Sequence, residues 1–247
     1  MKDRENKLWE GLSAEARAQL ATRNYRAGSL AERLQGPGVE AGELLAAKKS
    51  EPALAEAWIP GVEILPRKVH AQRFRGVFGE FVRRDEGALA QIGLWPVQWA
   101  SARMFARTAK GFHVHPPSIP KGKKPADWLR HLFVHEPKNY SARPYDREQW
   151  DVIFFVQGVV EIILRDTRAG LDARIMRVFI DGDNHRSGHN AGVVVPAGVA
   201  HALRAEGSED VIMVYGTSTS FQPEFEGRIA SEIETAELPK SWQKFLG

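Results

Sequence analysis

The sequence contains no cysteine, which excludes a disulfide framework, a thiolate zinc site and a cysteine nucleophile. It also has no long apolar run. The longest, Val152 to Leu164, is interrupted by Gln157, Gly158 and Glu161 and is too short to cross a membrane. Neither sign of charge dominates, because 34 basic residues stand against 31 acidic ones. The one tight basic cluster, 121–124, lies among prolines, as is typical of a solvated loop. We therefore expect neither a nucleic acid nor a membrane as partner.

The composition that remains is that of an ordinary globular protein, with 43% hydrophobic and 26% charged residues in a chain of 247. A chain of this length can bury a substantial core and can hold one domain with an appendage. Its first residues, MKDRENKLWEGLS, are charged throughout and predict no signal peptide. We expect a cytoplasmic protein.

Residues 1–57 predict a helical N-terminal arm. They are rich in Ala, Leu, Glu and Arg and poor in β-branched residues. Ser29-Leu-Ala-Glu32 has the pattern of a capping box, and Gly36 can end the helix that it starts. Ser13 can cap an earlier helix, and a third helical stretch, 40–58, is interrupted by Pro52. We expect this arm to lie outside the main domain and to support packing or dimer formation.

Residues 58–232 predict a mainly β domain. Short runs rich in Val, Ile and Phe alternate with Gly, Pro and Asp turns, which is typical of a β-sandwich or barrel. The expected strands include 151–156, 159–164, 173–180, 192–195 and 211–215. A basic, proline-containing stretch, about 116–148, is too long for a hairpin turn and predicts a loop insertion or lid. Residues 233–247 form a polar C-terminal tail.

Three segments hold the residues with chemical potential. His113 and His115 are two apart, so a strand would point both imidazoles to one face. Pro196-Ala-Gly198-Val-Ala-His201 combines a tight turn with a histidine on the strand that follows. Between these segments, Asp151 precedes an apolar run and a turn glycine, Gly158.

Together these segments resemble the two motifs of the cupin superfamily, whose fold is a jelly-roll barrel. The second motif is matched in full by Pro196, Gly198 and His201. The first departs from the pattern, because its acidic residue is Asp151 instead of the usual Glu and follows His113 by 38 residues. The resemblance implies a possible metal set of His113, His115, Asp151 and His201. Three imidazoles and one carboxylate suit a divalent Fe, Mn, Ni or Zn ion.

A more detailed resemblance, over about residues 60–231, is to the dTDP-4-dehydrorhamnose 3,5-epimerases. The matching segments are Arg75-Gly-Val-Phe-Gly-Glu80, Lys110-Gly-Phe-His113, Pro196-Ala-Gly-Val-Ala-His201-Ala and Tyr215-Gly-Thr-Ser-Thr-Ser-Phe221-Gln-Pro-Glu-Phe-Glu226. They occur in the family's order. The family is a jelly-roll cupin that is usually dimeric and needs no metal, so the resemblance implies a homodimer and a nucleotide-sugar substrate.

The family's chemistry is proton abstraction beside a keto group, with a His base on one face of the sugar and a Tyr acid on the other. Transferred by position, the resemblance makes His113 the base. It places Arg75, Glu80, Gln98, Lys110, His201, Phe221 and Glu226 in substrate binding. Lys110 stands where an arginine holds the pyrophosphate, and it keeps the charge without the bidentate geometry.

The departures from the family pattern set up the alternatives. Phe221 stands where we place the family's Tyr acid, and Asp151 reverses a positive charge that would stabilise an enolate. His115 replaces a Gln, and the late Asp that orients the base is not visible. Two of these changes, His115 and Asp151, complete the metal set.

Three functions follow from this pattern. The first is an epimerase-like enzyme, with His113 and Asp151 in its catalytic centre, acting on a carbohydrate or small oxygenated substrate. The second is a metal-dependent cupin isomerase, lyase or dioxygenase, in which the ion would polarise an oxygen of the substrate. The third is a non-catalytic metabolite-binding cupin, in which the histidines are satisfied inside the barrel without metal.

Overall fold

The structure of the protein is a computed structural model that carries side chains. It describes residues 28–47, 51–85, 87–93, 95–115, 148–168, 171–172, 174–182, 190–221 and 227–228. The predicted insertion lies almost wholly outside the described residues, as do the expected helix before residue 28, the C-terminal tail and Glu226. No helix in the described ranges has both the length and the apolar character needed to cross a membrane.

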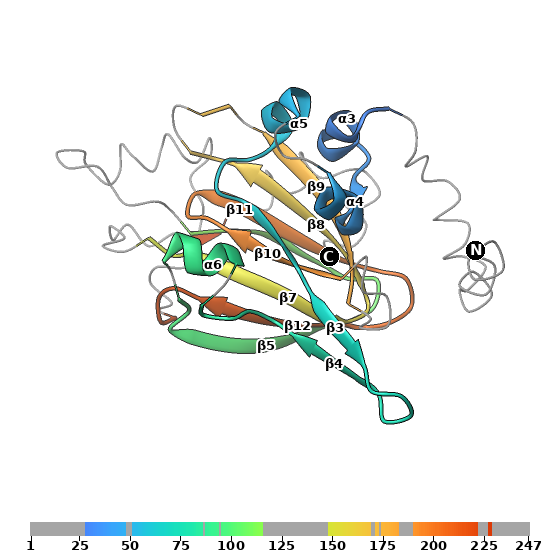
Figure 1. Cartoon of the computed structure of the whole chain (residues 1–247). Coiled ribbons are helices and arrows are strands. Elements are labelled where there is room, and N and C mark those ends of the chain that lie inside the picture. The colour runs from blue at the N-terminus through green and yellow to red at the C-terminus, as the bar shows by residue number, and fades with distance from the viewer. Residues whose placement is uncertain are drawn as a thin grey trace.

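Two facing β-sheets form the body of the molecule (Figure 1). The first contains, in spatial order, β1 (Val39–Glu40), β9 (Ile175–Asp181), β8 (Val159–Asp166), β11 (Val199–Glu206), β6 (Ala109–Val114) and β13 (Gly227–Arg228). The second contains β2 (Glu63–Pro66), β10 (Ala191–Val195), β7 (Asp151–Gln157), β12 (Val211–Thr217) and β5 (Gln98–Met104). Their strands pair antiparallel except β1 with β9. The predicted jelly-roll class is confirmed.

The turn between β7 and β8 joins the two sheets and needs glycine. Gly158 has a φ of 76°, in the left-handed region, and a Cβ there would lie 2.6 Å from the backbone oxygen of Asp210. The chain can therefore leave one sheet and enter the other in a single tight step. This places Asp151 at the far end of β7, away from the turn.

The main core fills the space between the sheets. Its fully buried side chains include Phe155 of β7, Ile162 and Leu164 of β8, and Val193 of β10. Burial of each such side chain contributes roughly 1.5–3 kcal/mol. These strands are buried on both faces, which explains their nearly continuous apolar sequence.

The helices α3 (Leu30–Gln35), α4 (Ala41–Ala46) and α5 (Pro52–Ala57) lie close together beside the sheets (Figure 1). The predicted capping box is confirmed, because Ser29 accepts from the Glu32 backbone while Glu32 accepts from that of Ser29. Pro52 does not interrupt a helix; it begins α5, where its missing N–H costs nothing.

These helices correct the expectation of an arm outside the barrel. Leu34, Leu44 and Leu54 are buried in the same core as the strands, and β1 extends the six-stranded sheet. Each helix has only six residues and depends on this apolar contact for its stability. The segment therefore closes one side of the barrel.

The hairpin of β3 (Lys68–Ala71) and β4 (Val77–Glu80) forms a separate two-stranded sheet. It extends away from the barrel in Figure 1, and Phe74 at its tip is fully exposed. The chain then returns through α6 (Gly87–Ile92), whose Leu89 packs with Leu65 and Phe154 on the outer side of the five-stranded sheet.

Candidate functional site

Three of the predicted histidines lie together between the sheets. His113 on β6 and His201 on β11 are register partners, and their rings stack with centroids 5.9 Å apart. The ring of His115, one residue beyond β6, lies 6.1 Å from that of His201. His115 and His201 are each only 7% exposed. The residue spacing within the two motifs therefore brings the three imidazoles close together.

The glycine turn of the second motif also holds the first motif. Gly198 has a φ of 78°, which a residue with a Cβ rarely adopts, and its N–H donates to the backbone oxygen of His115 at 2.6 Å. The N–H of Val199 donates to the oxygen of Pro196 and closes the turn. His115 therefore owes its position to a turn that lies more than 80 residues further along the chain.

Asp151 reaches the same cluster from β7 of the opposite sheet. Its Oδ2 lies 3.0 Å from Nε2 of His115 and 3.9 Å from Nε2 of His201. Its Oδ1 accepts a hydrogen bond from Nε2 of Gln149 at 2.9 Å, and the amide oxygen of Gln149 accepts from the hydroxyl of Thr219 at 2.7 Å. Both sheets thus contribute to one polar network.

Burial and charge act against each other on these groups. Burial alone would raise the pKa of Asp151, but the attraction of His115, its hydrogen bond, the electrostatic interaction with His201 and the hydrogen bond from Gln149 together lower it to about 2. Burial lowers the pKa of His201 to about 4, although Asp151 opposes this shift. At neutral pH the cluster therefore contains an ionised carboxylate and a neutral His201.

A cavity of about 240 Å³ opens beside this network. Its lining includes Lys110, Gln98 and Phe221 together with the predicted His113, His115, Asp151 and His201. Gln98 accepts a hydrogen bond from the backbone N–H of Phe221 at 2.8 Å, which draws the segment after β12 against β5. Seven of the ten predicted site residues thus meet at one cavity.

Three residues at this cavity were not predicted from the sequence as site residues: Gln149, Thr219 and Tyr215. Gln149 and Tyr215 line the cavity, and Thr219 holds the Gln149 amide. A signal for Gln149 was present, because it precedes Asp151 by two residues, the spacing that sends side chains of an extended chain to one face. Tyr215 lies on β12, in the sheet opposite to that of His113.

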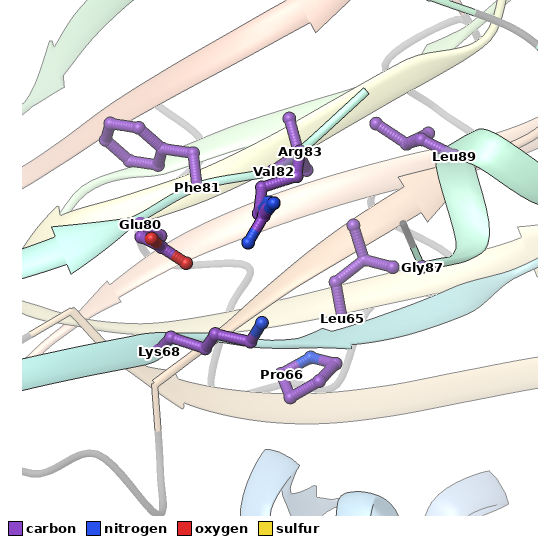
Figure 2. A pocket seen from close by; sticks show the side chains of 9 residues that line it. All are labelled: Leu65, Pro66, Lys68, Glu80, Phe81, Val82, Arg83, Gly87 and Leu89. Atoms are coloured by element: carbon purple, nitrogen blue, oxygen red, sulfur yellow. The ribbon is translucent and has the colours of Figure 1, made fainter. Parts of the chain in front are cut away.

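Arg75 and Glu80 are not at this cavity. Arg75 is exposed in the turn of the β3–β4 hairpin, and Glu80 lines a second cavity of about 250 Å³ near α6. Figure 2 shows Leu65 and Leu89 at one end of this second cavity and the Lys68 and Glu80 side chains at the other. Neither Arg75 nor Glu80 lines the cavity that holds the histidines of the same chain.

The members of the polar cluster contact one another directly. Within the described ranges, no group of three or more His, Asp or Glu residues is placed so that it could hold a metal ion. His115 and Asp151 contact each other directly, and His113 faces His201 through its ring. These residues, as they are placed, fit a hydrogen-bonded network.

No known protein-family profile matches the chain. The spore coat polysaccharide biosynthesis protein SpsL of Bacillus subtilis (strain 168) is 25% identical over 180 residues, which are 72% of this chain and 93% of SpsL. Among solved structures, the dTDP-6-deoxy-D-glucose-3,5-epimerase RmlC of Legionella pneumophila Philadelphia 1, in complex with dTDP-4-keto-L-rhamnose, is 18% identical. It matches with a TM-score of 0.50 over 75% of this chain and 78% of its own.

A dTDP sugar isomerase from Desulfovibrio desulfuricans G20 matches with a TM-score of 0.53 and 11% identity, over 74% of this chain and 96% of its own. This chain has the fold of the nucleotide-sugar epimerases. The resemblance predicted from four sequence segments is confirmed at the level of fold.

Proposed function

We propose that the protein is an epimerase-type enzyme that moves protons at carbons beside the keto group of a nucleotide-linked sugar. The observation that carries this proposal is the placement of a histidine and a tyrosine on opposite sheets around one cavity. His113 extends from β6, and Tyr215 from β12. A base on one face of a sugar and an acid on the other are what inversion of a carbon requires.

The proposed steps balance in protons and charge. The imidazole of His113 takes the proton from the carbon beside the carbonyl, and the electron pair of that C–H bond forms an enolate. The phenol of Tyr215 then donates its proton to the opposite face of the same carbon. Solvent returns a proton to the phenolate and removes one from the imidazolium. Phe221 has no hydroxyl for this role. Tyr215, which lines the same cavity, supplies one.

The substrate class rests on charge and on similarity. Lys110 lines the cavity and supplies a cation for the phosphates of a nucleotide. The similar Legionella protein holds dTDP-4-keto-L-rhamnose, and the name of SpsL places that protein in polysaccharide biosynthesis. Both favour a nucleotide sugar.

We also propose a homodimer in which the hairpin of one subunit reaches the cavity of the other. Phe74 and Phe78 of the hairpin are exposed, and Arg75 stands between them at its tip. Such a dimer would bring Arg75 and Glu80 to a substrate that they cannot reach in one chain. The cytoplasm remains the expected location of the protein.

The deciding experiment is to incubate the purified protein with dTDP-4-keto-6-deoxyglucose in D₂O and to follow deuterium incorporation and epimer formation by NMR. We expect both, without a change after dialysis against a chelator. Activity that is lost on chelation and restored by Fe, Mn, Ni or Zn would replace the proposal with the metal-dependent cupin. Tight nucleotide-sugar binding with no exchange would replace it with the metabolite-binding cupin.

A further inference from the structure

Gln149 occupies a central place in the polar network although no motif includes it. It is 7% exposed and lies two residues before β7. Its Nε2 donates to Oδ1 of Asp151 at 2.9 Å and lies 3.2 Å from Nε2 of His115. Its oxygen accepts from the Thr219 hydroxyl at 2.7 Å. One side chain therefore contacts both members of the Asp151–His115 pair and a third residue.

The chemistry of these partners fixes the orientation of the amide. An ionised carboxylate can only accept hydrogen bonds, so the amide nitrogen of Gln149 must face Asp151. The amide oxygen then faces Thr219, whose hydroxyl must donate. Thr219 is itself held, because its backbone oxygen accepts from the hydroxyl of Thr217 at 2.6 Å. The orientation of Gln149 is thus fixed by the segment that follows β12.

This orientation divides the two oxygens of Asp151. Oδ1 is engaged by Gln149, while Oδ2 faces the imidazoles of His115 and His201. Without Gln149, Oδ1 would lose its hydrogen-bond donor in a place that is only 6% exposed. The carboxylate could then turn, and the imidazole of His115 would lose a fixed acceptor.

The position of the negative charge matters for the proposed reaction. An enolate that forms in the cavity would be repelled by an uncompensated carboxylate nearby. Hydrogen bonds from Gln149 and His115 stabilise the negative charge of Asp151 and reduce its repulsion of the enolate. The benefit would appear in the transition state, when the enolate charge develops, more than in substrate binding.

We propose that Gln149 is a positioning residue of this site, which fixes the carboxylate of Asp151 and through it the imidazole of His115. This inference rests on the proposed function for its kinetic consequence, but its geometric part does not. Thr219 belongs to the same hydrogen-bonded network, because its hydroxyl holds the Gln149 amide. The two residues should therefore give matching effects when either is changed.

The first test is spectroscopic and independent of turnover. Protein labelled with ¹⁵N-histidine should show a protected, downfield ring N–H signal from His115, absent in His115→Gln. We expect Gln149→Met, which keeps the volume and removes the amide, to shift or remove that signal. Gln157→Leu removes an exposed glutamine at the other end of β7 and serves as the matched control. A signal unchanged in Gln149→Met would overturn the inference.

The second test uses Thr219, whose partly exposed position makes misfolding less of a concern. Thr219→Val removes the hydroxyl at constant shape, and Thr219→Ser keeps it. We expect Thr219→Val and Gln149→Met to lower kcat about tenfold to a hundredfold, with KM changed less than about threefold. Thr219→Ser should retain most of the wild-type rate. Equal rates in the Val and Ser variants would contradict the positioning role.

The two tests separate this inference from the proposed function. If the wild-type protein exchanges no proton of the sugar, the proposed function fails, and the NMR signals of Gln149→Met and Thr219→Val still decide the inference. If the wild type is active while both variants keep its kcat and its signal, the inference alone fails.

Discussion

The cavity between the sheets and the cavity near α6 have nearly equal volumes, about 240 and 250 Å³, but they differ in how their polar groups are held. In the cavity between the sheets, Asp151, His115 and Gln149 are buried and contact one another. The cavity near α6 has an apolar part with Leu65 and Leu89, and its charged Lys68 is exposed to solvent. Volume therefore does not distinguish the two cavities, whereas the way in which their polar side chains are fixed does.

The strands explain this difference. The residues of the first cavity come mainly from β5, β6, β7, β11 and β12, which belong to two sheets with a common core. Those of the second come mainly from β2, a two-stranded hairpin and a six-residue helix. The free-energy penalty of burying a charged group is smaller when its hydrogen-bond partners are already held in place. The cavity between the sheets provides such partners.

Among the proposed variants, removal of the His113 imidazole should cause the largest loss of activity. We expect His113→Gln to lower the rate of deuterium exchange by about a hundredfold to ten-thousandfold, because the positioned proton acceptor is lost. The control is His70→Gln on β3, where the ring is exposed and stacks on Phe78. Equal losses in both variants, measured by NMR in D₂O, would remove the distinction between the two regions.

Removal of the acid should separate exchange from inversion. Tyr215→Phe should reduce epimer formation by about a hundredfold while His113 still exchanges a proton on one face. Phe221→Tyr adds a hydroxyl in the same cavity and should increase inversion only in the Tyr215→Phe background. Product analysis and exchange rates from one NMR sample measure both quantities. Full inversion by Tyr215→Phe would exclude Tyr215 as the donor.

The buried network should also make stability depend on pH. Folded His201 binds a proton near pH 4, whereas an unfolded histidine does so near 6.5, so the unfolded state takes up the proton first as pH falls. Stability from this residue is present above about pH 6.5 and is lost toward pH 4. Between pH 7 and pH 4.5 the loss should be about 2–3 kcal/mol.

Urea unfolding of wild-type and His201→Gln protein at these two pH values measures that term. The variant should show a smaller loss of unfolding free energy than the wild type. His70→Gln is again the control, because it removes a histidine that is exposed. If the unfolding free energy of His201→Gln changed with pH as much as that of the wild type, another group would cause the pH dependence.

The sequence predicted which residues meet inside the barrel better than it predicted what surrounds them. His113, His115 and His201 could be placed because strand periodicity and a Pro-Gly turn determine side-chain direction locally. Asp151 could be placed because Gly158 marks the end of its strand. The contact of Gln149 with Thr219 joins residues 70 apart, and no local pattern reports such a pair.

The surroundings depended on packing that local patterns do not contain. Residues 1–57 were expected outside the barrel because their pattern is helical, but the apolar side chains of α3, α4 and α5 join the core of the strands. The Arg75-Gly-Val-Phe-Gly-Glu80 segment matched the family in sequence, yet its hairpin extends away from the barrel in Figure 1, and neither Arg75 nor Glu80 lines the cavity between the sheets. The local sequence pattern predicts whether a segment is a helix or a strand. Contacts between residues far apart in the sequence determine what that segment packs against.

The smallest expected effect concerns this hairpin and tests whether the two regions meet across a dimer. Arg75→Ala should raise KM about tenfold with little change in kcat, because it removes a charged contact to the nucleotide far from the reacting carbons. Alone, this result would not tell which subunit supplies the arginine. A mixture of Arg75→Ala with His113→Gln can tell.

If each site combines the cavity of one subunit with the hairpin of the other, a mixed dimer contains one intact site. A random mixture should then recover roughly a quarter of the wild-type activity at low substrate, more than either variant alone. The mixture is best prepared by co-expression with two different tags, so that the mixed dimer can be purified. Activity that equals the average of the separate variants, or a monomer at every concentration in light scattering, would show that the hairpin does not complete a neighbour's site.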